Sequence, residues 1–113
     1  MASLNDICYE QIEDQYRYGL FGDFKLVVDK NTGYFNARKL CRSVGKDVTG
    51  WIEQDRTQEL LAYYGHPELY EVISENDAVC GKYACSRMLL SVIQYVSLNF
   101  YAKCLNIIMK DMN

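Results

Sequence analysis

A turn between two short apolar runs places the tightest constraint on how this chain folds. Residues 24–29, Phe-Lys-Leu-Val-Val-Asp, are rich in side chains that favour an extended strand. The next four residues, Lys-Asn-Thr-Gly, are typical of a turn, and Gly33 can adopt the positive φ angle that tight turns require. Tyr34 and Phe35 then begin a return strand. The sequence therefore predicts a β-hairpin over residues 24–35.

A helix is predicted directly after this hairpin. Asn36 is a favourable N-cap residue, and Gly45 is typical of a helix end. Between them, apolar residues recur at the spacing of a helix face that is buried in a core. These residues are Ala37, Leu40, Cys41 and Val44. The basic residues of the same segment must then point to solvent, and they are Arg38, Lys39 and Arg42.

A second helix is predicted after a short link, from about Gly50 to Tyr64. Thr49 can cap its N-terminus, and Gly65-His66-Pro67 ends it. Its expected core residues are Trp51, Ile52, Leu60 and Leu61. Two helices joined by a tight link, the first of them basic on its exposed face, indicate a helix-turn-helix-like pair.

The segments before the first hairpin and after the second helix predict one short helix and three further strands. We expect a short helix from Ile7 to Gln15 and a strand over residues 16–21. A second hairpin is expected to pair residues 71–74 with residues 81–84 across a Glu-Asn-Asp turn.

Residues 86–111 are predicted to be helical, with a second helix start near Ser97. The core face of the first part is Met88, Leu89, Val92, Ile93 and Val96. The apolar stripe then continues through Leu98, Phe100, Tyr101, Cys104, Leu105 and Ile108. The elements together predict an α+β fold class, a small single domain over residues 1–113 with β-hairpins packed on helices.

Composition excludes several classes of protein. Half of the 113 residues are hydrophobic, which suits one globular domain. No apolar run reaches the roughly 18 residues that cross a bilayer, and the N-terminus carries no secretory signal pattern. Five cysteines, an odd number at otherwise apolar positions, indicate reduced thiols. We therefore expect an intracellular protein with no membrane partner.

The residue pattern indicates neither a metal site nor a catalytic site. The spacing of Cys80 and Cys85, with His66 as the single histidine, is not that of a zinc site. No serine or cysteine has catalytic partners at a recognisable spacing, and no glycine-rich loop cradles a phosphate. We expect a protein that is not an enzyme and carries neither a cofactor nor a metal.

Charge is concentrated in one segment. Residues 25–46 carry six basic residues and one acid, although the whole chain has a net charge of −3. Residues 47–79 carry eight acids and one arginine. The charge of either segment is also consistent with a surface that contacts only solvent. A polyanion, however, responds to the local field more than to the total charge, so the basic segment is a candidate binding surface.

The motifs of this region carry a family resemblance. The run from Phe24 to Cys41, which includes Gly-Tyr-Phe-Asn-Ala and Lys-Leu-Cys, is followed by Gly45-Lys46 and by Trp51. This order resembles the KilA-N domain of large DNA viruses. Residues 81–84, 95–97 and 100–103 are similar to the closing segment of that family, so the resemblance covers most of residues 17–109.

The resemblance implies a compact α+β domain similar to the fungal APSES DNA-binding fold. The expected protein is viral and is located inside the host cell, either in the viral factories of the cytoplasm or in the nucleus. The resemblance also implies nucleic-acid binding, with duplex DNA as the expected partner. Basic side chains would contact phosphates, and Arg56 and Gln58 are candidate base readers. Helix starts at Asn36 and Thr49 could direct backbone amides at phosphates. The candidate nucleic-acid-binding residues are Lys25, Lys30, Asn36, Arg38, Lys39, Arg42, Lys46, Arg56 and Gln58.

A protein-interaction module is the alternative. The acidic second helix and the ten tyrosines could contact a viral or host protein or a second copy of the chain, since tyrosine is favoured at interfaces. In that case the KilA-N-like domain has lost its DNA affinity and serves as a protein-binding or dimerisation unit.

Overall fold

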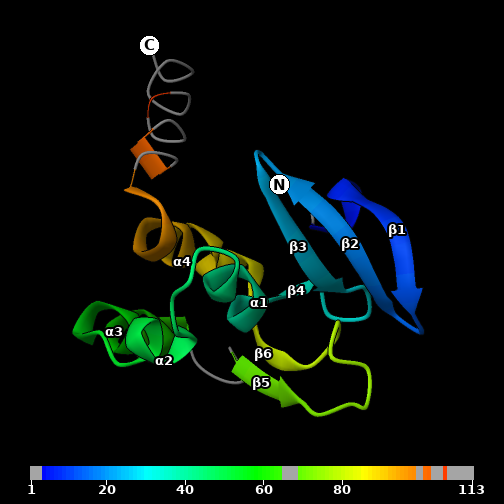
Figure 1. Ribbon diagram of the computed structural model, residues 1–113. Coiled ribbons are helices and arrows are strands. Elements are labelled where there is room, and N and C mark those ends of the chain that lie inside the picture. Colours follow the sequence, from blue (N-terminus) through cyan, green and yellow to red (C-terminus); the bar gives the residue numbers. More distant parts are fainter. Residues whose placement is uncertain (1–3, 65–68, 99–100, 103–105, 107–113) are drawn as a thin grey trace.

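A six-stranded antiparallel sheet and a group of short helices form the fold (Figure 1). The computed structural model describes residues 4–64, 69–98, 101, 102 and 106. The strands are β1 (Cys8–Glu13), β2 (Tyr16–Phe21), β3 (Phe24–Asp29), β4 (Tyr34–Asn36), β5 (Leu69–Val72) and β6 (Gly81–Ala84). The helices are α1 (Ala37–Arg42), α2 (Val48–Ile52), α3 (Asp55–Tyr64) and α4 (Leu89–Val96), with 3-10 turns η1 (Leu4–Ile7) and η2 (Ser86–Met88). This architecture confirms the predicted α+β class.

The strands lie in the order β1-β2-β3-β4-β6-β5, and every neighbouring pair is antiparallel. Strand β6 pairs with β4, so the second hairpin extends the sheet that the first hairpin begins. In Figure 1, strands β1 to β3 stand at one end of the molecule, and helices α2 and α3 lie at the other. Helix α1, which follows β4 directly, lies between these two ends.

The predicted helix from Ile7 to Gln15 is wrong. Only η1 is helical, and residues from Cys8 onward form strand β1, which pairs with β2. Asp14 adopts a φ of 49° at the tight turn between these strands. Pairing with a neighbouring strand satisfies the backbone of β1, and this tertiary contact outweighs its weak local helical pattern.

The hairpin over residues 24–35 is confirmed. Val28 lies opposite Phe35, and Asp29 lies opposite Tyr34. Gly33 has a φ of 77°, and its amide donates to the Asp29 carbonyl at 2.7 Å, which closes the turn. The turn therefore forms at the predicted position and determines where α1 begins.

Helix α1 also begins where the sequence predicts, because Asn36 is its N-cap. The Asn36 side-chain oxygen accepts a hydrogen bond from the Lys39 amide at 3.0 Å. The predicted core residues Ala37, Leu40 and Cys41 are buried. Val44 is 41% exposed, which corrects its assignment to the buried face. The helix ends at Arg42, so Val44 lies beyond the last turn and no longer follows the helical spacing.

The single helix predicted from Gly50 to Tyr64 is two helices. Helix α2 begins earlier, at Val48, and its N-cap is Asp47, whose carboxylate accepts from the Thr49 amide at 2.9 Å. Thr49 is therefore inside the helix and is not the cap. Helix α3 begins at Asp55 after a break. The Gln58 side-chain amide donates to the Ile52 carbonyl at 2.7 Å, which satisfies a backbone group that the break exposes.

The expected core of this region is formed nonetheless. Trp51 is fully buried and Leu61 is buried, with Ile52 and Leu60 packed against the core. That α1 and the helix after it form a helix-turn-helix-like pair stays a prediction.

The predicted second hairpin forms with residues 81–84, but β5 is Leu69–Val72 and not residues 71–74, so Ile73 and Ser74 follow the strand. Within the predicted helical segment 86–111, α4 ends at Val96. Ser97 is extended, with φ −156° and ψ 97°, and ends α4. Tyr101 donates from its amide to the Ser97 carbonyl at 3.1 Å, as expected for a new helix start near Ser97. Leu98 is 68% exposed, and most of the predicted stripe beyond it lies outside the described residues.

The main core lies between one face of the sheet and the helices. Sheet residues Leu26, Val28 and Phe35 pack in one cluster with Trp51 and with α4. The predicted apolar face of α4 is confirmed, since Met88, Leu89, Val92, Ile93 and Val96 are all buried.

A tyrosine cluster occupies the other face of the sheet. The Tyr70 and Tyr83 rings stack with centroids 5.5 Å apart, and Tyr34 contacts Tyr70 at 5.2 Å. The Tyr70 hydroxyl donates to the buried Asp29 carboxylate at 2.7 Å. The Tyr83 hydroxyl donates to the Val79 carbonyl at 2.7 Å, which holds the loop between β5 and β6 over this face.

Asn36 supports both α1 and this loop, and replacing it by alanine tests that role. The substitution removes the helix cap and leaves the Cys80 carbonyl without its 2.8 Å hydrogen bond from the Asn36 amide. We expect Asn36→Ala to lower the free energy of unfolding by about 2–3 kcal/mol in urea denaturation followed by circular dichroism. Asn31→Ala, in the exposed turn, is the matched control. Equal effects of the two substitutions would contradict the assigned role.

Candidate nucleic-acid interface

Basic side chains extend from the outer face of α1. Because Ala37, Leu40 and Cys41 face the core, Arg38, Lys39 and Arg42 are directed toward solvent. Arg42 is exposed, whereas the side chains of Arg38 and Lys39 retain 27% and 23% of their accessible surface. The hairpin and the cap together therefore present three cations on one short helix.

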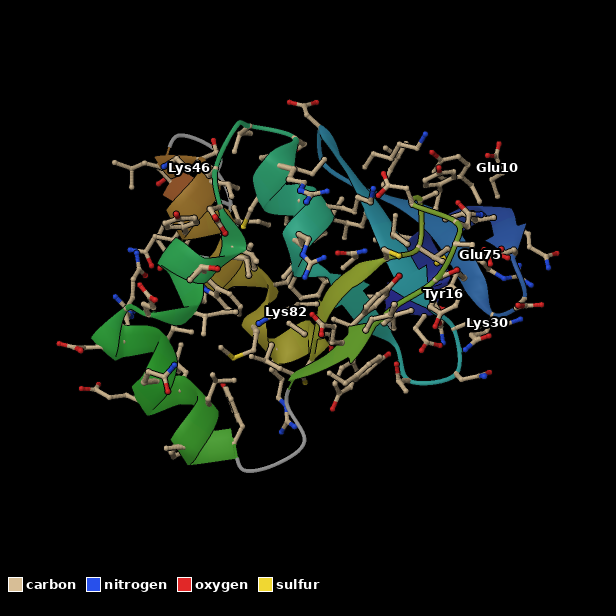
Figure 2. The ribbon with its side chains drawn as sticks, turned by 60° about the horizontal axis from the view of Figure 1, so that its bottom comes forward. Glu10, Tyr16, Lys30, Lys46, Glu75 and Lys82 are labelled. Atoms are coloured by element: carbon tan, nitrogen blue, oxygen red, sulfur yellow. The ribbon has the colours of Figure 1, made fainter. Side chains whose placement is uncertain are left out.

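A concave pocket of about 450 Å³ lies beside this helix. Its cationic lining is Arg38 and Arg42 from α1, Lys46 from the following link, and Lys82 from β6. Figure 2 shows Lys82 on β6 and Lys46 next to the end of α4. We call this site, with these four residues, the basic pocket. It brings cations from two distant parts of the sequence to one surface.

Lys82 is not among the residues that the sequence predicts for the interface. The available signal was its position in the Gly-Lys-Tyr-Ala segment, which carries part of the family resemblance. What brings it to the basic pocket is the pairing of β6 with β4, where Tyr83 lies opposite Asn36. The pairing of β4 with β6 is a non-local contact, which a pattern within either strand does not specify.

Acidic residues contact two of the predicted cations. Arg38 forms an ion pair with Glu71 at 3.2 Å, and Lys39 forms one with Asp77 at 3.0 Å. Hydrogen bonding to Lys39 and its charge lower the pKa of the Asp77 carboxyl. Both acids come from β5 and the loop after it, so this part of the chain partly neutralises the outer face of α1.

Asp47 also lines the basic pocket. Hydrogen bonds from Thr49 lower the pKa of the Asp47 carboxyl, and the charges of Arg38 and Arg42 lower it further. The carboxylate therefore stays ionised at neutral pH and offsets one positive charge of the pocket.

Lys25 and Lys30 lie away from this pocket. Lys25 is on strand β3, and its ammonium lies 3.9 Å from the centroid of the Tyr18 ring on the neighbouring strand β2. Figure 2 shows Lys30 at the end of the molecule that carries the first strands, opposite the end that carries Lys46. Of the six basic residues that are close in sequence, Arg38, Arg42 and Lys46 thus line the basic pocket, whereas Lys25 and Lys30 do not.

The remaining candidate residues differ in accessibility. Asn36 is fully buried, and both ends of its amide are bonded within the protein, so it supports the surface from beneath. Gln58 is exposed, but its amide nitrogen is bonded to the Ile52 carbonyl. Arg56 is exposed on α3 and lies next to a second pocket that also includes Lys46. Thr49 lines the basic pocket.

Within the part of the chain that the structure describes, no three His, Cys, Asp or Glu side chains gather as metal ligands would. Cys8, Cys41, Cys80 and Cys85 are free thiols. Burial raises the pKa of the Cys41 thiol to about 11, so this cysteine is protonated at neutral pH. No described helix is long and apolar enough to span a membrane.

These elements define a small α+β domain whose most distinctive surface is a concave cluster of cations. The KilA-N domain family matches residues 19–113, which is most of the chain. The chain therefore belongs to the KilA-N domain family. No solved structure gives a significant match.

Similar proteins come from large DNA viruses. The KilA-N domain-containing protein 313L of Invertebrate iridescent virus 6 is 43% identical over 96% of this chain and 34% of its own length. Protein 315L of the same virus, with the same domain name, is 54% identical over 67% of this chain and 34% of its own length. Protein L32 of Acanthamoeba polyphaga mimivirus is 34% identical over half of the chain. This chain spans about a third of the length of the first two relatives.

The ion pair between Lys39 and Asp77 is testable by titration. We expect Lys39→Met to raise the pKa of the Asp77 carboxyl toward its ordinary value of 3.8, because the hydrogen bond and the nearby charge are lost. Carboxyl carbon NMR over acidic pH measures this value directly. Lys30→Met, at the other end of the molecule, should leave it unchanged. An Asp77 pKa that Lys39→Met does not move would show that the pair is not formed in solution.

Proposed function

We propose that the chain binds duplex DNA through phosphate contacts made by the basic pocket and the outer face of α1. The observation that carries the proposal is the convergence of Arg38, Arg42, Lys46 and Lys82 around one concavity. Membership of the KilA-N family, which is generally associated with DNA binding, supports it. The role is one of binding, not of catalysis, in a protein that acts inside the infected cell.

The proposed mechanism is electrostatic. Arginine and lysine neutralise phosphates and release condensed counterions, which yields affinity with little sequence information. The Lys46 side chain is held in place, since its ammonium donates to the Tyr95 carbonyl at 2.8 Å, and the backbone of Lys82 belongs to strand β6. A side chain that is already held in place loses little conformational freedom when a phosphate binds.

The salt dependence of binding to a labelled random duplex tests this proposal. Fluorescence anisotropy should show affinity falling steeply with added salt. Charge reversal of Arg38, Lys39 and Arg42 to glutamate should reduce affinity by at least ~100-fold at low salt, with an unchanged circular dichroism spectrum. Reversal of Lys25 and Lys30 is the matched control and should change affinity by less than about threefold. Equal losses in both variants would contradict the assignment of the site to α1.

The acids that contact α1 compete with phosphate for the same cations. We therefore expect the double substitution Glu71→Gln and Asp77→Asn to raise duplex affinity about three- to tenfold at low salt, because each exposed ion pair is weak. The anisotropy assay measures this change. Glu10→Gln, on exposed strand β1, is the matched control. A loss of affinity in the double variant would show that these acids orient the cations and do not compete with DNA.

A second candidate function is binding of a protein partner. Tyr63 on α3 is 82% exposed and Ile73 after β5 is 88% exposed, and large apolar side chains of this kind occur at interfaces. The helix that carries Tyr63 also carries the acids Asp55 and Glu59. Absence of duplex binding even at low salt would favour this function, and light scattering would then distinguish a second copy of the chain from a different partner.

A further inference from the structure

Lys46 lies between two pockets. One is the basic pocket, and the other, of about 470 Å³, lies between the beginning of α3 and the end of α4. This second pocket is lined by Lys46, Gln54, Arg56, Ser91, Gln94, Tyr95 and Leu98. We call it the amide pocket, after its two glutamines. Each pocket has a volume within the range of about 300–1,000 Å³ that is typical of small-ligand sites.

The wall that separates the pockets is held by specific contacts. The Tyr95 hydroxyl donates to the Asp47 carbonyl at 3.0 Å. The Lys46 ammonium donates to the Tyr95 carbonyl at 2.8 Å and lies 4.9 Å from the centroid of the Tyr95 ring. A Cβ atom on Gly50 would collide with the Tyr95 hydroxyl, so glycine at this position permits the ring to lie against α2. Tyr95 and Lys46 therefore have fixed positions relative to both pockets.

The floor of the amide pocket is also fixed. The buried Trp51 indole donates to the Ser91 hydroxyl at 3.0 Å, and Ser91 lines this pocket. Ser91 is thus held in place from the core side, by the same tryptophan that anchors α2.

The available polar groups of this pocket are suited to a nucleobase. The Gln54 and Gln94 side chains form no hydrogen bond with any described residue, so each offers a donor and an acceptor. Arg56 adds a planar donor group, and Leu98, which is 68% exposed, adds an apolar surface. Nucleobase edges are recognised by amide and guanidinium groups, and their faces pack on apolar or aromatic surfaces.

We propose that the amide pocket binds an unpaired nucleobase while the basic pocket binds a phosphate of the same strand, with Lys46 between the two. This inference rests on the phosphate binding proposed above. Bases in a duplex are stacked and do not protrude into a concave pocket, so an unpaired strand is the ligand that suits this geometry. No acidic residue lines the amide pocket among the residues that the structure describes, so the phosphates of a single strand meet no local repulsion there.

Single-stranded DNA of about 12 nucleotides and mixed sequence is the probe, beside a duplex of the same sequence. The test variant is the double substitution Gln54→Ala and Gln94→Ala. We expect it to weaken single-strand binding on the order of tenfold, because the base loses its polar contacts, and to leave duplex binding and its salt dependence unchanged. Gln11→Ala, in strand β1, is the matched control and should bind both probes as the unsubstituted protein does.

The outcomes separate this inference from the proposed function. Duplex binding with no single-strand binding, or a double variant that binds the single strand normally, overturns the nucleobase site and leaves the phosphate site standing. Equal losses on both probes also overturn it, because the glutamines would then serve duplex binding. Absence of binding to either probe overturns both proposals.

Discussion

The buried side chain of Asn36 connects the parts of the molecule on which the candidate site depends. Its oxygen caps α1 by accepting from the Lys39 amide, and its nitrogen donates to the Cys80 carbonyl at the start of β6. Gly81 adjoins it so closely that a Cβ atom there would collide with the Asn36 amide. One amide thus sets the direction of α1, which carries Arg38 and Arg42, and the position of the strand that carries Lys82. The two walls of the basic pocket are joined beneath its surface.

The local charge of the pocket lining and the total charge of the chain are opposite in sign. The chain is acidic overall, yet the fold collects cations from α1, the link after it and β6 around one concavity. The same fold brings Glu71 and Asp77 onto the outer face of α1. Among the cations of the pocket, Arg38 is paired with Glu71, whereas Arg42, Lys46 and Lys82 form no ion pair with any described acid. The unpaired positive charge of the pocket therefore comes from α1, the link after it and β6 together.

Local sequence predicted the segments whose structure depends on local chemistry. The turn at Gly33, the cap at Asn36 and the apolar face of α4 follow from backbone preferences and helical spacing. The break between α2 and α3 could not be predicted in this way, because burial of Trp51 and the bond from Gln58 to Ile52 are tertiary effects. The separation of Lys30 from Lys46 and the arrival of Lys82 depend on strand pairing, which local patterns do not encode.

Backbone NMR of the labelled protein during titration with a short random duplex tests the central claim most directly. We expect amide shifts to concentrate on α1, on the link around Lys46 and on β6 around Lys82, and to diminish as salt is added. The amides around Lys25 and Lys30 should keep their positions. Shifts that concentrate on strands β1 to β3 instead, or no shifts at low salt, would contradict the assignment of the basic pocket as the DNA-binding surface.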